Sequence, residues 1–249
     1  MHHLGQTRSA IRAGHLLQTP DTFVRAPLPG MVAATAVVHV GPALGAKFTQ
    51  YTAELEAGGA LGPSQAQRFV YVLEGEMEGG GRRLGPDHYI FAPQDAPAWT
   101  SPQGAGAVWT SPQGARLAVI EKIYQPLAGS PAPAAFTGDE SAVAPQALLD
   151  DPAIQVRRLL PDDTAFDFAV NTMTYDPGAS LPMVEMHVME HGLLMLAGEG
   201  IYRLGDCWYP VAAGDFIWMA PYCPQWFGAL GKQPAKYLIY KDWNRHPLA

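Results

Sequence analysis

Four side chains in the C-terminal part of the chain have the types and spacing of a metal site: Glu185, His187, His191 and Gln225. Glu185 and His187 lie two residues apart in an apolar run. A β-strand turns every second side chain to the same face, so we expect the carboxylate and the imidazole to point the same way. His191 follows after three residues, and Gly198 supplies a turn signal. The segment is therefore predicted to form two short strands flanking a kink, where three ligands converge.

Imidazole and carboxylate ligands with open coordination positions suit a divalent transition ion. The amide oxygen of Gln225 would add a neutral donor. Glu185 and the two histidines stand in an otherwise hydrophobic stretch, where such groups are costly to bury without a partner. We therefore favour a metal site over a purely structural polar cluster.

The composition predicts an all-β protein. Of the 249 residues only 16% are charged, while 26 are Gly and 23 are Pro. The apolar residues come in short runs containing Val, Ile and aromatic residues, separated by turn residues. This pattern is typical of many short strands.

Several classes of function and location are disfavoured by charge and hydropathy. The net charge of -7 leaves no basic stripe for a nucleic acid and no polybasic patch for a membrane surface. The N-terminus lacks the apolar centre of a signal peptide, and no run of about 18 apolar residues exists. Two cysteines are too few for a disulfide framework. We expect a cytoplasmic protein.

An internal repeat divides the chain. Three segments of the first half recur in the same order, shifted by about 120 to 128 residues: 73–76 in 196–199, 87–93 in 215–221, and 115–120 in 235–240. Ordered repetition indicates a duplicated β unit. A stretch rich in Ala and Pro lies between the copies and is typical of a linker. The predicted parts are a first barrel over 1–128, a linker over 129–150 and a second barrel over 151–249.

The two copies differ in their chemistry. The repeat places Arg68 opposite His191 and Ser64 opposite His187, so the first copy has no set of ligands. We expect one metal ion per chain, bound in the second barrel.

The second half resembles the cupin superfamily. The spacing Gly-x6-Glu-x-His-x3-His-x6-Gly, counted from Gly178, and the later Gly-Asp-x5-Pro, from Gly214 to Pro221, resemble the two signature motifs of that superfamily. Two copies make a bicupin, which implies two tandem antiparallel jelly-roll β-barrels. The rearranged set of Glu, His, His and Gln resembles one family in particular, the (S)-ureidoglycine aminohydrolases of purine (allantoin) breakdown.

That resemblance implies a function and a set of site residues. Mn²⁺ would be bound by Glu185, His187, His191 and Gln225, and (S)-ureidoglycine would be hydrolysed to (S)-ureidoglycolate and ammonia. The substrate-contacting Tyr and Lys of the family match Tyr237 and Lys241, and Glu185 and Gln225 would also face the substrate.

The residues support this transfer independently. Tyr237, Ile239 and Lys241 share one face of the last predicted strand, so all three face the barrel if Ile239 does. Lys241 would offer a cation to the substrate carboxylate or, if burial lowers its pKa, a proton to the departing amine. Glu185 would be both ligand and proton acceptor, and Tyr202 would add a hydroxyl contact.

Two other functions remain open at this point. Two His and a carboxylate with open positions also suit an Fe(II) dioxygenase. A cupin that binds a ligand without catalysis is the second alternative, because one fold hosts many functions. We expect a homo-oligomer in each case, since duplicated cupin barrels usually expose an apolar outer sheet face.

Overall fold

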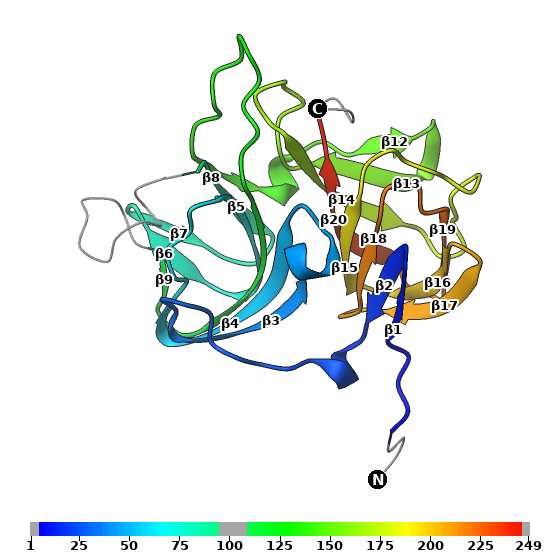
Figure 1. Ribbon diagram of the computed structural model, residues 1–249, viewed down its shortest axis with the longest axis horizontal. Coiled ribbons are helices and arrows are strands. Elements are labelled where there is room, and N and C mark those ends of the chain that lie inside the picture. The colour runs from blue at the N-terminus through cyan, green and yellow to red at the C-terminus, as the bar shows by residue number, and fades with distance from the viewer. Residues whose placement is uncertain (1–4, 95–108, 246–249) are drawn as a thin grey trace. The chain divides into compact units, whose positions relative to one another are not determined.

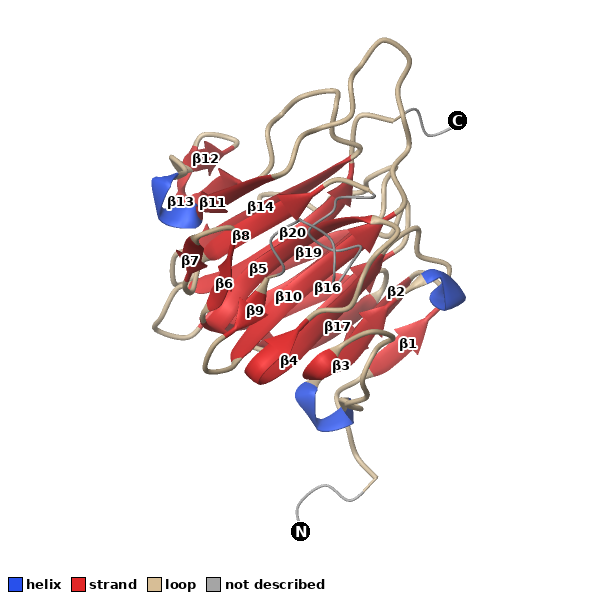
Figure 2. Cartoon of the chain, turned by 90° about the vertical axis from the view of Figure 1, so that its left-hand side faces the viewer, coloured by secondary structure: helices blue, strands red, loops and turns tan. Residues whose placement is uncertain are grey.

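The computed structural model describes residues 5–94 and 109–245. Over these ranges the chain forms twenty β-strands, three short 3-10 helices and no α-helix, and strands dominate the view in Figure 2. This confirms the predicted all-β fold. No helix among the described residues is long and apolar enough to cross a membrane.

The chain forms two compact units, but their boundaries differ from the predicted ones. One unit runs from Val24 to Ala142, and the other joins the segment up to Phe23 to the chain from Val143 onward. The expected first domain was wrong at its N-terminus, because residues 10–18 add two strands to the sheet of the second unit. The predicted linker over 129–150 contains strands of both units. Its Ala and Pro content indicated a linker, yet residues 136–139 and 146–148 pair as strands.

The first unit is a jelly-roll barrel built on a nine-stranded antiparallel sheet (Figure 1). Its elements are β3 (Val32–Val40), η2 (Pro42–Leu44), β4 (Thr49–Ala60), β5 (Gln67–Gly75), β6 (Met77–Gly79), β7 (Arg82–Leu84), β8 (His88–Ala92), β9 (Thr110–Ser111), β10 (Ala115–Lys122), β11 (Phe136–Asp139) and η3 (Glu140–Ala142). Closing a sheet in this way leaves few open strand edges.

The second unit is a jelly-roll barrel built from two sheets. The larger sheet has the order β1-β2-β18-β15-β20-β14-β13-β12, and the smaller one has the order β17-β16-β19. Its elements are β1 (Ala10–Arg12), β2 (His15–Gln18), η1 (Pro20–Thr22), β12 (Gln146–Leu148), β13 (Asp151–Arg158), β14 (Phe168–Tyr175), β15 (His191–Ala197), β16 (Glu199–Leu204), β17 (Cys207–Ala212), β18 (Phe216–Met219), β19 (Gln225–Leu230) and β20 (Ala235–Asp242).

The core of the second unit lies between these sheets. Aromatic rings from both pack in edge-on and tilted pairs with centroids 4.9 to 5.7 Å apart, geometries that aromatic quadrupoles favour. They belong to Tyr175 of β14, Tyr202 of β16, Phe227 of β19 and Tyr237 of β20. Aromatic rings of the large sheet thus pack against aromatic rings of the small sheet inside the barrel.

The repeat is visible in two equivalent glycines. Gly75 is the last residue of β5 and has φ +73°, and Gly198 follows β15 with φ +71°. A Cβ at either position would lie 2.2 to 2.4 Å from a backbone carbonyl oxygen. Both the left-handed conformation and the close approach require glycine, which explains why this residue recurs in the two copies.

Candidate metal centre and substrate pocket

Glu185 and Gln225 are held opposite each other by the backbone. The Glu185 N–H donates to the Gln225 carbonyl at 2.8 Å, and the Gln225 N–H donates to the Glu185 carbonyl at 2.9 Å. The two residues form an isolated antiparallel bridge at the start of β19. This pair of hydrogen bonds brings a carboxylate and an amide from distant parts of the sequence to one point.

The predicted strand before the kink was wrong. Glu185 makes only that bridge, and residues 186–190 form no strand. The apolar side chains that suggested a strand lie at the surface, with Met183 and Met186 about 60% exposed, so no sheet face holds this segment. The carboxylate and imidazole still meet, because His187 Nε2 lies 3.0 Å from Glu185 Oε2.

The two histidines face each other across the site. His191 is the first residue of β15, and its ring centroid is 4.9 Å from that of His187. Burial lowers the pKa of His191 well below its ordinary value, and the charges of Lys241 and His187 lower it further. A neutral ring keeps a nitrogen lone pair available to a metal ion.

Among the described residues, no three His, Cys, Asp or Glu side chains are already gathered closely enough to enclose an ion. The candidate set contains three such residues and one amide: Glu185, His187, His191 and Gln225. The Gln225 oxygen accepts a hydrogen bond from the Tyr202 hydroxyl at 3.3 Å. All four predicted ligands thus reach one region from three separate segments of the chain.

Tyr202 and Tyr237 lie beneath this region in the barrel. Burial raises the pKa of both phenols well above the ordinary value, so both stay protonated donors. The Glu185 carboxylate contributes to the pKa rise at each of them and at Tyr175. The Glu185 carboxylate is thus within electrostatic range of all three phenols.

Lys241 connects the candidate ligands to a cavity. It lies directly opposite His191 in the pairing of β15 with β20, on the face of β20 that also carries Tyr237 and Ile239. Burial lowers the pKa of Lys241, the Glu185 carboxylate opposes that shift, and the Arg158 guanidinium adds to it. The ammonium thus lies within electrostatic reach of both Glu185 and Arg158.

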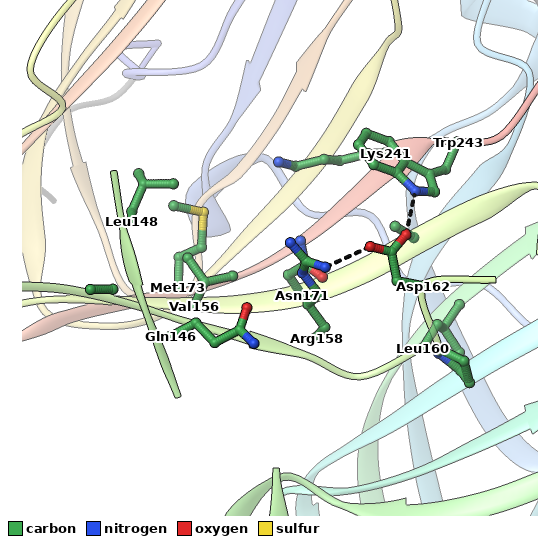
Figure 3. A pocket seen from close by; sticks show the side chains of 13 residues that line it. Gln146, Leu148, Val156, Arg158, Leu160, Asp162, Asn171, Met173, Lys241 and Trp243 are labelled. Atoms are coloured by element: carbon green, nitrogen blue, oxygen red, sulfur yellow. Dashed lines mark hydrogen bonds and ion pairs between the residues drawn. The ribbon is translucent and has the colours of Figure 1, made fainter. Parts of the chain in front are cut away.

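The cavity has a volume of about 170 Å³ and opens beside Lys241 (Figure 3). Its walls come from β12, β13, β14 and β20, together with Trp243. Its polar lining includes Lys241, Arg158, Asp162 and Asn171. The volume corresponds to a few water molecules, so the cavity suits a small molecule.

Sequence reasoning did not identify three residues of this region. Tyr175, whose hydroxyl lies 2.7 Å from that of Tyr237, stands on β14 with Asn171, and Arg158 stands on β13. Alternation along residues 171, 173 and 175 would have predicted one inward face. Nothing in the sequence indicated that this face lies next to the last strand.

Comparison with known proteins identifies the family. The model of the family described as "Cupin domain" matches residues 171–240. An (S)-ureidoglycine aminohydrolase of Arabidopsis thaliana is 38% identical over 253 aligned residues, which cover 98% of this chain and 80% of that protein. The chain belongs to the (S)-ureidoglycine aminohydrolase family.

Solved structures share the fold of this chain. The putative glyoxylate-induced protein of Pseudomonas aeruginosa has 30% identity and a TM-score of 0.84, covering 97% of this chain and 92% of that one. Oxalate decarboxylase of Bacillus subtilis, described with Mn(II) centres, has a TM-score of 0.68 at 11% identity, covering 97% and 80%. That second similarity shows a shared fold only. The bicupin architecture of the aminohydrolase family is thus common to both structures.

Proposed function

We propose that this protein hydrolyses (S)-ureidoglycine to (S)-ureidoglycolate and ammonia. The observation that carries the proposal is the convergence of Glu185, His187, His191 and Gln225 next to Lys241, in a chain of this family. Two relatives, from Arabidopsis thaliana and Escherichia coli, are named (S)-ureidoglycine aminohydrolase after this reaction. Hydrolysis breaks the bond between the central carbon and its amine nitrogen, and water supplies the oxygen of the new alcohol.

A divalent transition ion fits the donor set. His191 is neutral, His187 and Glu185 are 3.0 Å apart, and the Gln225 oxygen is oriented by Tyr202. Imidazole nitrogens with carboxylate and amide oxygens are ligands that Mn²⁺ accepts. We propose that these four residues hold Mn²⁺, which when bound would supply Lewis acidity and orientation for the substrate.

Residues of this chain would accept and donate the protons of the reaction. Glu185 is the acceptor for the proton that the attacking water loses, because its carboxylate is in contact with His187. Lys241 is the cation that gives a proton to the departing amine, which leaves as ammonia. Its lowered pKa makes that transfer easier. Tyr202 and Tyr237 stay protonated and act as neutral donors that position the substrate.

The test is ammonia release from (S)-ureidoglycine, generated in situ by an allantoate-hydrolysing enzyme because the substrate is short-lived. The generating reaction itself releases one ammonia per allantoate, so we expect a second ammonia per allantoate that depends on added Mn²⁺ and disappears after chelation. A dioxygenase would instead consume oxygen, so an oxygen electrode should record no uptake. A non-catalytic ligand-binding protein would bind ureides without releasing ammonia. Either of these two outcomes would overturn the proposal.

We further propose that the enzyme acts in purine (allantoin) breakdown as a cytoplasmic homo-oligomer. The loop that carries Glu185 and His187 exposes the apolar side chains Met183 and Met186, and exposed apolar patches often mark protein interfaces. Sedimentation as a monomer at micromolar concentration would contradict the oligomer.

A further inference from the structure

The cavity beside Lys241 contains polar groups that the fold leaves without partners. Among the described residues, the Asn171 side-chain amide and the Lys241 ammonium form no hydrogen bond or ion pair, although Asn171 is only 9% exposed and both line the cavity. Both side chains reach the cavity, so their hydrogen-bonding capacity remains for a ligand.

Strand register fixes how these groups are arranged. Arg158 of β13 pairs directly with Asn171 of β14, and Asn171 pairs directly with Ile239 of β20. Lys241 lies two residues beyond Ile239 on the same face. Directly paired side chains are about 5 Å apart and diagonal ones about 7 to 8 Å apart. Arg158, Asn171 and Lys241 therefore form one triangle on the inner face of the large sheet (Figure 3).

The Arg158 guanidinium is held in place by an acidic residue of the cavity wall. Its Nη1 donates to Asp162 Oδ2 at 2.6 Å, and Asp162 Oδ1 accepts a hydrogen bond from Trp243 Nε1 at 3.2 Å. The guanidinium of Arg158 has five N–H donors, and Asp162 accepts from only one of its nitrogens. Other N–H groups of Arg158 therefore remain for a ligand. Two cations, Lys241 and Arg158, and one carboxylate, Asp162, therefore line the cavity. The excess positive charge favours an anion.

We propose that Arg158 and Asn171 bind the carboxylate of the substrate in this cavity. The proposal rests on the proposed function, because it assigns one end of ureidoglycine to a wall of the same site. A guanidinium and an amide N–H donate to the two carboxylate oxygens, a pairing that fixes both position and angle. The substrate's amine-bearing carbon then points along β20 toward Lys241 and Glu185. Lys241 is left to serve the departing amine.

The experiment uses N-carbamoylglycine, which is the substrate without its amine, and its neutral amide, N-carbamoylglycinamide. Isothermal titration calorimetry would measure both with the metal-loaded protein. The variants are Arg158→Gln, Asn171→Asp and the control Arg157→Gln. Arg157 is the adjacent residue of β13, and its Nε donates to the Val143 carbonyl instead. The control therefore removes the same charge from the opposite face of one strand.

We expect the wild-type protein to bind the acid more tightly than the amide. Arg158→Gln should weaken binding of the acid roughly 10- to 100-fold and change binding of the amide by less than about twofold, as expected for a lost charge-assisted contact. Asn171→Asp keeps the side-chain size and puts a like charge against the acid, so it should weaken the acid at least as much. Arg157→Gln should match wild type.

Kinetics give an independent result. In the ammonia assay, Arg158→Gln should raise KM and leave kcat within a few-fold, because carboxylate binding contributes in the ground state as well as in the transition state. Equal losses for the acid and the amide, equal effects of Arg157→Gln and Arg158→Gln, or a wild-type protein that does not prefer the acid would each overturn the subsite. Absence of ammonia release from the wild type would overturn the proposed reaction instead, whatever the calorimetry shows.

Discussion

Lys241 lies directly opposite His191 where β20 pairs with β15, and the equivalent pairing of β10 with β5 sets Glu121 opposite Arg68 in the first barrel. The first pair sets an imidazole beside an ammonium, and the ammonium lines the cavity. The second pair is closed on itself, because Arg68 Nε donates to Glu121 Oε1 at 2.6 Å and Tyr51 also donates to that oxygen. The position that His191 and Lys241 occupy in the second barrel is thus occupied by a neutralised ion pair, Arg68 and Glu121, in the first barrel.

The ion pair of Arg68 and Glu121 in the first barrel predicts that metal binds in the second barrel. His187→Ala or His191→Ala should remove the metal, because each deletes a nitrogen ligand from the proposed set. Arg68→Met, at the position that matches His191, should leave the metal content unchanged. Elemental analysis of the purified variants would measure this. Two ions per chain in the wild-type protein, or a loss of metal in Arg68→Met, would contradict the assignment of the site to the second barrel.

The same pair predicts a stability effect confined to the first barrel. Arg68 is only 3% exposed, so Arg68→Met should leave the Glu121 carboxylate without its cation and cost about 3 kcal/mol. Adding Glu121→Gln should recover most of that loss, since the uncompensated charge is removed. Urea denaturation of the two single variants and the double variant would give the coupling energy. Additive effects would show that the ion pair is not coupled.

The sequence predicted the fold class and the site residues for different reasons. Short apolar runs cut by Gly and Pro predict many strands even when the pairing of those strands is unknown. The spacing of Glu185, His187 and His191 predicts neighbouring side chains from local backbone geometry alone. The two strands within residues 10–18 could not be assigned to the second barrel, because β18, the partner of β2, lies about 200 residues away. Arg158 and Asn171 were missed for the same reason. Their proximity to Lys241 depends on the order of β13, β14 and β20 in the sheet.

A buried histidine of the first barrel predicts how stability depends on pH. Burial lowers the pKa of His39 from 6.5 to about 3. Between these values the unfolded chain takes up a proton that the folded state excludes, so the free energy of unfolding falls as the pH falls below about 6.5. His39→Gln should flatten this dependence by up to about 1.4 kcal/mol per pH unit. Urea denaturation at pH 5 and pH 7 would test it, and parallel slopes for wild type and variant would contradict it.

Lys241→Met separates a structural lysine from a functional one. The substitution keeps the length of the side chain and removes a cation that burial disfavours, so folding and metal content should be retained. If the ammonium serves the departing amine, kcat/KM should fall roughly 100-fold, mostly through kcat. Lys236→Met is the matched control, because Lys236 lies on the same strand at an odd spacing and so on the opposite face. A Lys241→Met enzyme as active as wild type in ammonia release would remove Lys241 from the site, and equal losses in both variants would show that only the overall charge matters.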